Sequence, residues 1–310
     1  MLSYAIRRIL QFIPTIIGIS LIMFVLLNVL PGNAALMSAD KGRSADSNYI
    51  ETMKKQWGLD KPLHIRYLNY MKGLVQGDLG KSFSRGEDVA SLIGARIWPT
   101  LKLALVAIAI AVVFGIPLGF VSALKHNTWL DTFSMVGAVS GVSVPHFWLG
   151  LILMYILSVK FHLLPTFGYG DGSFSYMIMP SITLGVGYMA LLARTTRAAA
   201  LEVLSQDYIR TARAKGLSQL WINRKHIFRN TLVLIMTTAG LQFGSLLGNT
   251  VIVEKLFSWP GIGSLMVDSI FQRDVSVTQG CILLIVSVFL VINLTVDLLY
   301  SIVDPRIQYE

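Results

Sequence analysis

The sequence predicts an all-α membrane protein with six transmembrane helices. Hydrophobic residues make up 54% of the 310 positions and charged residues only 14%, so the chain is more apolar and less charged than a soluble domain. Crossing hydrocarbon about 30 Å thick takes about 20 mostly apolar helical residues, because lipid offers no partner to backbone amides. Six segments meet this length, approximately residues 9–30, 99–124, 132–157, 177–197, 230–253 and 277–301.

The first span follows Arg7 and Arg8, which is also how a secretory signal begins. Its apolar run is longer than the core of a signal and continues into "LPGN", so we expect it to remain in the mature protein. Prolines in or beside the spans predict kinks, since proline removes a helical hydrogen bond. They are Pro14, Pro117, Pro145 and Pro180.

Residues 31–98 are expected to lie outside the membrane. This segment mixes amphipathic turns with Gly and Pro breaks, which predicts short helices over the outer mouth. Its "GDLGKS", residues 77–82, ends like a phosphate-binding loop. The leading glycine of that motif would fall at Val75, so the stretch does not indicate a nucleotide site.

The distribution of positive charge predicts the orientation. Lysine and arginine gather on cytoplasmic loops of membrane proteins, and long external segments cross largely regardless of charge. Placing residues 1–8 and 302–310 in the cytoplasm leaves a core at 99–301, with a cytoplasmic loop at 198–229. The net charge of +9 is then a membrane signature, and no nucleic-acid partner is expected. The residues placed inside are Arg7, Arg8, Lys125, Arg194, Arg197, the basic residues of the loop and Arg306.

The loop between the fourth and fifth spans is predicted to hold a short helix at about 205–216. Ser205 is a suitable cap, Asp207 and Lys215 suit the two ends of the helix dipole, and Gly216 ends it. A second helix begins at Ser218 and leads into the fifth span. Basic side chains are dense in and beside this loop: Arg197, Arg210, Arg213, Lys215, Arg224, Lys225 and Arg229.

Two interpretations of this helix remain open. The small residues Thr211, Ala212 and Ala214 permit close approach of another protein, with Tyr208 and Ile209 as anchors in a groove. A basic amphipathic helix resting on anionic headgroups has a similar composition.

The fifth span carries two stripes. Gly240, Gly244 and Gly248 recur every four residues on one face, which permits close helix contact in lipid. Polar residues form the other stripe, which either lines a translocation pathway or makes hydrogen bonds between helices. They are Thr238, Gln242, Ser245 and Asn249, with Glu254 at the outer end as a gate, a solute contact or a solvated charge.

Few residues indicate other chemistry. Asp297 is the one acid clearly within a span, and we expect it to pair with a basic residue near the cytoplasmic end. The single cysteine, Cys281, excludes an intramolecular disulfide, and the five histidines lack the spacing of metal ligands. Hydrolase and metalloprotease motifs do not occur, so we expect no enzymatic activity.

Several separated motifs resemble one family. "YIRTARAKGL" followed by "RNTL" resembles the EAA coupling loop of binding-protein-dependent ABC importer permeases, with Ala212 and Gly216 on its second alanine and its glycine. Arg210 and Thr211 depart from the first two motif positions, as in the dipeptide and oligopeptide branch. "QWGLDKPL", "IVEKLFSWPGIGSLMVDSIFQRD", "NLTVDLLYSIVDPRI" and the first span also resemble that branch, over nearly the whole chain.

This resemblance implies the fold of a type I ABC importer permease in a bacterial inner membrane. It also implies four kinds of partner: a second homologous permease, two cytoplasmic ATPases, an external binding protein and membrane lipid. The chain itself would bind no cofactor, since ATP and Mg would be held by the ATPases. The residues that would contact an ATPase are Tyr208, Arg210, Thr211, Ala212, Arg213, Ala214, Lys215 and Gly216.

The solute is predicted only by class. Peptides, including dipeptides, oligopeptides and glutathione-like molecules, are the first expectation for this branch, with nickel chelates or sugars as alternatives. An ion-coupled secondary transporter is the competing class, and it would show paired repeats and acids near the midplane, neither of which we find.

Overall fold

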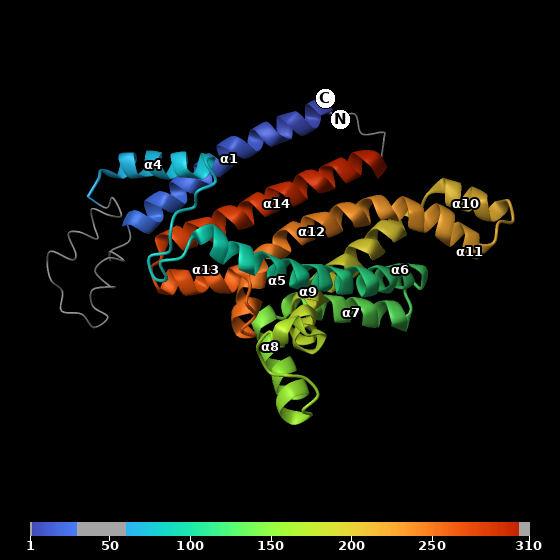
Figure 1. The fold of residues 1–310 in the computed structure, drawn as a ribbon. Helices are drawn as coiled ribbons and strands as arrows, with labels where there is room; N and C mark the ends of the chain where they lie inside the picture. The colour runs from blue at the N-terminus through green and yellow to red at the C-terminus, as the bar shows by residue number, and fades with distance from the viewer. Residues whose placement is uncertain (1, 30–59, 304–310) are drawn as a thin grey trace.

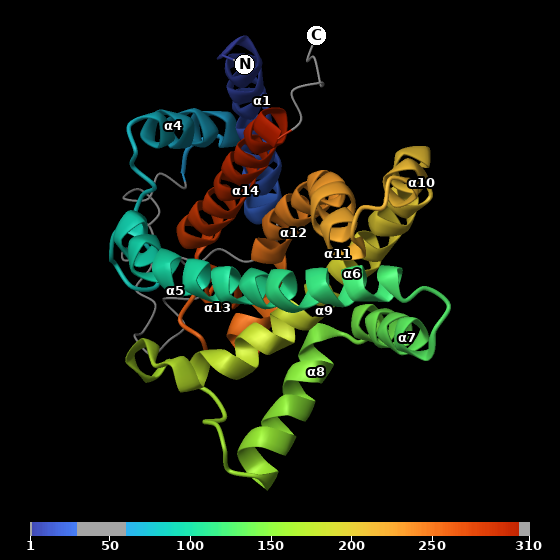
Figure 2. The ribbon, with the colours of Figure 1, turned by 90° about the vertical axis from the view of Figure 1, so that its right-hand side faces the viewer.

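Long helices form the body of the computed structural model, which describes residues 2–29 and 60–303. Figures 1 and 2 show them in two views at right angles. The long elements are α1 (Leu2–Val29), α5 (Val89–Ile110) running through η1 (Ala111–Gly115) into α6 (Ile116–Leu124), α7 (Trp129–Ser143), α8 (His146–Leu153) running into η2 (Met154–Lys160), α9 (Phe174–Leu204), α12 (Arg229–Leu256) and α14 (Val275–Val303). The short ones are α4 (Leu63–Val75), η3 (Gly170–Gly172), α10 (Asp207–Ala214), α11 (Gln219–Trp221), η4 (Ile222–Phe228) and α13 (Ile262–Phe271).

The predicted all-α membrane class is confirmed. Within residues 2–29 and 60–303, four helices are long and apolar enough to cross a membrane: Ile6–Asn28, Val89–Leu124, Phe174–Leu204 and Val275–Leu298. Two bent pairs, Trp129–Ser143 with His146–Lys160 and Gln219–Leu232 with Leu234–Leu256, bring the number to six if each counts as one span.

The third predicted span, 132–157, is wrong as a single rod. The chain bends by 103° between α7 and α8, and α8 points away from the other helices (Figure 2). Val144 adopts an extended backbone with ψ of 123°. Proline disfavours a helical conformation in the residue before it, so Pro145 explains the break. Pro14 and Pro180, by contrast, lie inside unbroken helices.

Helix α9 is the centre of the packing and is bordered by α5, α6, α7, α8 and α12. Small residues bring its neighbours close. A Cβ added at Gly119 of α6 would lie 2.2 Å from the carbonyl oxygen of Ala193, so the two backbones touch there. Leu184 and Leu192 of α9 are fully buried.

The external segment predicted at 31–98 is described from residue 60 onward, and its residues 31–59 lie outside the described part. Helix α4 packs on α1: the Tyr67 hydroxyl lies 3.0 Å from the Ser20 Oγ, and Arg66 donates to the Asn28 Oδ1 at 2.5 Å. Burial, with Tyr67 nearby, raises the pKa of Tyr70 to about 12. Helix α5 begins at Val89, inside the stretch expected to be external.

The "GDLGKS" stretch has a structural role. Ser82 is buried and its Oγ donates to the Asp274 Oδ2 at 2.6 Å, and both the amide and the Oγ of Ser84 donate to the same oxygen. The other oxygen of Asp274 accepts from the Val277 amide at 3.3 Å. Asp274 therefore caps α14 and fixes the turn that contains Ser82 and Ser84 to it.

Candidate functional site

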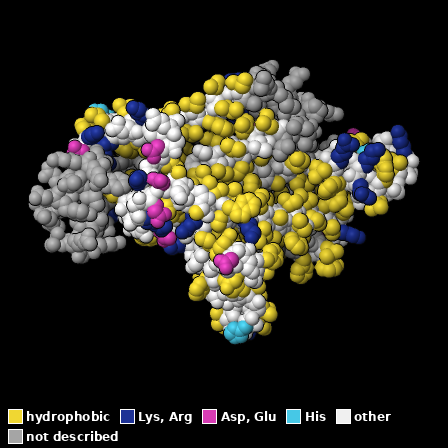
Figure 3. All heavy atoms as spheres, viewed as in Figure 1, with side chains coloured by type: hydrophobic (Ala, Val, Ile, Leu, Met, Phe, Trp, Pro, Cys, Tyr) yellow, Lys and Arg dark blue, Asp and Glu magenta, His cyan; other side chains and the backbone are white. Residues whose placement is uncertain are grey.

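A short basic helix, α10, stands at one end of the molecule. Figure 3 shows Lys and Arg side chains gathered there, while hydrophobic side chains cover the middle. Figure 1 places α10 at the same end as the start of α1 and the last turns of α14. Seven of the eight candidate docking residues are exposed: Tyr208, Arg210, Thr211, Arg213, Ala214, Lys215 and Gly216.

The predicted cap of α10 is wrong. The Ser205 Oγ donates back to the Glu202 carbonyl at 2.7 Å and ends α9, and Gln206 occupies the cap position without a side-chain bond. The other predicted signals hold. Gly216 follows the helix with φ of +74°, a conformation that glycine adopts without strain, and the Ser218 Oγ accepts from the Trp221 amide at 3.4 Å.

The opposite face of α10 is closed by the chain's own core. Ile209 is fully buried and Ala212 is 7% exposed, and both pack in a cluster with Ala123 of α6 and Ala200 of α9. Ile222 and Ile227 of the following segment complete it. Ile209 is therefore unavailable as an anchor for another protein, and the small Ala212 side chain lets α10 pack closely on α6 and α9. The expectation that Ile209 and Ala212 face a partner protein is wrong, because both are buried in the chain's own core.

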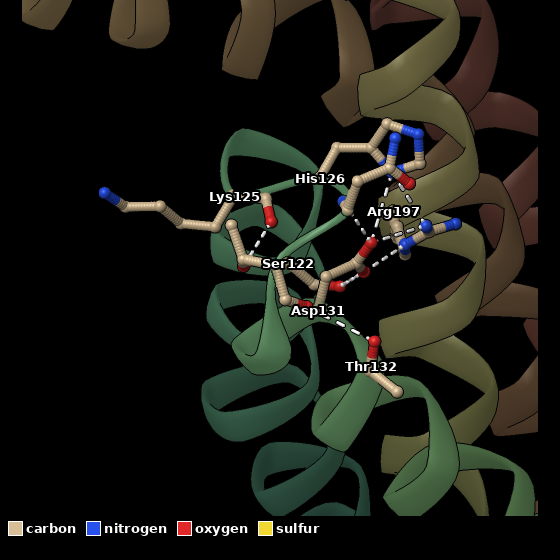
Figure 4. A network of polar contacts seen from close by, with 8 residues as sticks. Ser122, Lys125, His126, Asp131, Thr132 and Arg197 are labelled. Atoms are coloured by element: carbon tan, nitrogen blue, oxygen red, sulfur yellow. Dashed lines mark hydrogen bonds and ion pairs between the residues drawn. The ribbon is translucent and has the colours of Figure 1, made fainter.

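Beside this core lies a network that sequence spacing did not indicate (Figure 4). Asp131, at the start of α7, is 4% exposed. Its carboxylate accepts from Arg197 of α9 through Nε at 2.6 Å and Nη2 at 2.8 Å, and from the Ser122 Oγ of α6 at 2.5 Å. The Asn127 amide donates to it at 3.1 Å, and the His126 Nδ1 lies 3.1 Å away. The signal available in the sequence was one acid just before a predicted span, 132–157, and one arginine at the end of another, 177–197.

The glycine stripe of α12 meets α14 at two of its three positions. A Cβ added at Gly240 would lie 2.4 Å from the Val296 Cγ2, and one at Gly244 would lie 3.1 Å from the Phe289 ring. Gly248 has nothing within 4 Å of such an atom, so it makes no helix contact within the described part of the chain.

The polar stripe of α12 divides into two environments. Gln242 is 5% exposed, and neither side-chain amide atom has a hydrogen-bond partner among the described residues. Thr238 and Ser245 donate to backbone carbonyls of their own helix at 2.9 Å. Asn249 is exposed, and its Nδ2 donates to the Tyr188 hydroxyl of α9 at 2.7 Å.

Tyr188, which is only 7% exposed, links Asn249 to α8. Its ring stacks on His146 with 6.2 Å between centroids, and the His146 Nδ1 lies 3.1 Å from the Thr183 carbonyl. A Cβ at Gly187 would lie 2.8 Å from the His146 ring, so the glycine admits the histidine. Sequence reasoning missed Tyr188 and His146 because they lie on other helices than the stripe they extend.

Glu254 is not a solvated charge. It is fully buried, and its carboxylate accepts from the Thr100 Oγ1 at 2.6 Å and the Ser264 amide at 2.9 Å. A Cβ at Gly261 would lie 2.2 Å from the Glu254 Cδ, so only glycine fits over the carboxylate. Glu254 therefore fastens the start of α13 to α12 and α5, and the expectation that it contacts solute or solvent is wrong.

Two other charges of the spans have partners. Asp297 pairs with Arg8 at the start of α1, with Oδ2 3.2 Å from Nη2, which fits the expected pairing near one end of the sixth span. Lys255 pairs with Asp268 of α13.

Comparisons with known proteins give one family over most of the chain. Residues 115–309 match the family of the binding-protein-dependent transport system inner membrane component. Residues 1–104 match the N-terminal family of the binding-protein-dependent transport system membrane component.

Curated relatives match along their full length. The glutathione transport system permease protein GsiC of Escherichia coli (strain K12) is 45% identical over 310 residues, covering 100% of both chains. The protein of the same name from Shigella boydii serotype 4 (strain Sb227) is 44% identical, also with 100% of both chains covered.

Solved structures share the fold. An inward-facing form of the MetNI methionine ABC transporter has a TM-score of 0.60 and 20% identity, covering 69% of this chain and 96% of that chain. An amino acid ABC transporter solved with histidines has a TM-score of 0.54 and 18% identity, covering 70% and 95%.

Proposed function

This chain belongs to the family of binding-protein-dependent transport system inner membrane components, and on that premise we propose that it forms half of the translocation pathway for glutathione or related peptides. It is a multi-pass permease of an ABC importer and is not itself an ATPase. Membership implies separate ATPase and binding-protein partners.

The observation that carries the coupling proposal is the two-sided character of α10. One face is packed into the core formed by α6 and α9, and the other offers Thr211, Ala214 and Gly216 between basic side chains. A displacement of the exposed face is therefore passed into the spans. We propose that this face docks on one of two cytoplasmic ATPases, which hold ATP and Mg, while a second homologous permease completes the pathway.

The proposed pathway surface is the exposed part of the α12 stripe with its neighbours on other helices. Asn249, Tyr188 and His146 form a continuous polar run across α12, α9 and α8. Polar groups in a span usually face a bundle interior or water, which supports a lining role for Asn249 and, at its side, Ser245. Thr238 and Gln242 continue the same stripe toward α10.

Glutathione is proposed as solute because the relatives named for its transport match this chain over their whole length. A small peptide with charged termini also suits a pathway with amide and hydroxyl groups. These side-chain groups can hydrogen-bond the charged termini without a buried countercharge. The binding protein would deliver the solute to the outer mouth, beside α4 and α13.

The test is reconstitution of the permease pair with its ATPases and binding protein in vesicles. Glutathione is expected to stimulate ATP hydrolysis and to accumulate in the vesicles only with ATP present. Stimulation by a nickel chelate or a sugar instead would reject the solute assignment. Uptake that follows an ion gradient without ATP would reject the coupling proposal.

The same preparation tests α10. Ala214→Asp places a charge on the exposed docking face, and Leu220→Asp places the same charge on the neighbouring α11, where Leu220 is 70% exposed. Ala214→Asp is expected to weaken ATPase binding about tenfold or more, equivalent to ~1.4 kcal/mol, and Leu220→Asp to leave it unchanged. Equal binding in the two variants would count against α10 as the docking helix.

A further inference from the structure

The buried carboxylate of Asp131 joins three spans at one point. Ser122 lies at the end of α6, Asp131 in the first turn of α7 and Arg197 near the end of α9. Arg197 reaches both carboxylate oxygens, Nε to Oδ1 at 2.6 Å and Nη2 to Oδ2 at 2.8 Å. Such a two-bond pairing fixes orientation as well as distance. Figure 4 shows the side chains converging between the three helices.

The turns that hold Asp131 are also the turns that hold α10. Ser122 is followed directly by Ala123, and Arg197 is followed one turn later by Ala200; both alanines pack against Ile209 and Ala212 of α10. One side of this small block of α6 and α9 thus carries α10, and another side carries α7.

Helix α7 is held at this end and packs against α9 again farther along, where a Cβ at Gly141 would lie 3.1 Å from the Ala190 Cβ. A half-open groove of about 360 Å³ lies along this contact, lined by Gly137 and Gly141 of α7 and by Val186 and Ala190 of α9, among others. At its far end α7 meets the 103° break and continues into α8. Gly150 of α8 rests against Leu256 and Phe257 at the outer end of α12, where a Cβ would meet Leu256 at 2.6 Å.

We propose that Asp131 and Arg197 are the positioning residues through which movement of α10 is passed to α7 and, across the break, to α8. This rests on the proposed docking of an ATPase on α10. The ion pair acts as a pivot: it holds the first turn of α7 to the block that carries α10, so a shift of that block is passed to α7. Neither residue contacts solute or nucleotide in this role.

A neutral side chain of the same shape separates the role of the charge from that of packing. Asp131→Asn keeps the size of the residue and the oxygen that accepts from Ser122, but it removes the charge that holds the guanidinium. The matched control is Asp268→Asn, because Asp268 of α13 pairs with Lys255 of α12 at the opposite end of the molecule.

The measurement is the amount of solute imported per ATP hydrolysed by the reconstituted complex. Asp131→Asn is expected to bind the ATPases and to hydrolyse ATP within about twofold of the unaltered complex, while import per ATP falls about tenfold, a common size for coupling between sites. Asp268→Asn is expected to leave the ratio unchanged. Arg197→Lys retains the charge with one hydrogen bond and is expected to recover part of the ratio lost in Arg197→Gln.

Three results would overturn the pivot: an unchanged ratio in Asp131→Asn, a parallel loss of hydrolysis and import, or equal ratios in Arg197→Lys and Arg197→Gln. If the Asp131→Asn variant does not insert into the membrane, the comparison of Arg197→Lys with Arg197→Gln tests the pivot on its own. Failure of the docking proposal is distinguishable, because Ala214→Asp and Leu220→Asp would then bind the ATPases equally well.

Discussion

At the scale of single residues, Asn249 and Glu254 show why position along a helix decides a side chain's role. The two are five positions apart on α12, which at 3.6 residues per turn rotates the side chain by about 140°. Asn249 is exposed beside Tyr188, whereas Glu254 is fully buried under α13. A charge at the end of a span is usually solvated, but α5 and α13 close over this one, so its hydrogen bonds replace water.

Replacing Asn249 with leucine tests the lining role. The change removes the bond to Tyr188 and a polar contact for solute, together about 1–2 kcal/mol, so uptake is expected to fall roughly five- to thirtyfold. Assembly with the partner subunits is expected to persist, which co-purification measures.

Tyr188→Phe is the matched control for this variant. It removes the same hydrogen bond but leaves the amide of Asn249 on the exposed surface, so uptake is expected to fall less than in Asn249→Leu. Unchanged uptake kinetics in Asn249→Leu would reject the lining role, and equal losses in both variants would assign the effect to the hydrogen bond alone.

At the scale of elements, equal spacing in the sequence does not give equal contacts. Gly240, Gly244 and Gly248 recur at the same interval, yet α14 touches only the first two. Spacing fixes which residues share a face of α12, and the crossing of α12 and α14 decides how far along that face the contact extends. The break between α7 and α8 is the converse case, since Pro145 predicts a kink and packing decides its size.

The glycines give a paired prediction for stability. Gly240→Ala places a methyl group 2.4 Å from the stiff Val296 side chain and is expected to destabilise the permease by about 1–3 kcal/mol. Gly248→Ala meets nothing within 4 Å and is expected to be neutral or to stabilise by up to about 1 kcal/mol through helix propensity. Thermal unfolding of the purified permease measures both, and equal shifts would contradict the α12–α14 contact.

At the scale of the whole molecule, the basic helix α10 and helix α13 lie at opposite ends. The basic α10 lies with the start of α1 and the last turns of α14, and α13 lies at the other end (Figure 1). This arrangement supports the proposal that both termini and α10 are cytoplasmic, because basic residues remain on the inner side of a membrane.

Thiol labelling tests this orientation. The natural Cys281 is fully buried, whereas Leu220 and Phe271 are 70% and 79% exposed at opposite ends. In intact cells whose outer membrane has been made permeable, a thiol reagent that cannot cross the inner membrane is expected to label the cysteine of Phe271→Cys and not that of Leu220→Cys. The opposite pattern would invert the proposed orientation, and the unaltered chain serves as the control for background labelling.

The sequence by itself determined the helical class, the number of apolar segments, the basic loop and the family resemblance. Each of these depends on composition or on local spacing, and the requirement that lipid-embedded backbone be helical makes that information sufficient. Tertiary structure decided the rest: that Ile209 and Ala212 face inward, that Glu254 is buried under α13, and that Asp131 meets Arg197. Residues 131 and 197 are far apart in the chain, so nothing in local spacing relates them. The physical reason is that burial and pairing depend on which helices pack together, a property of the assembled molecule and not of any one segment.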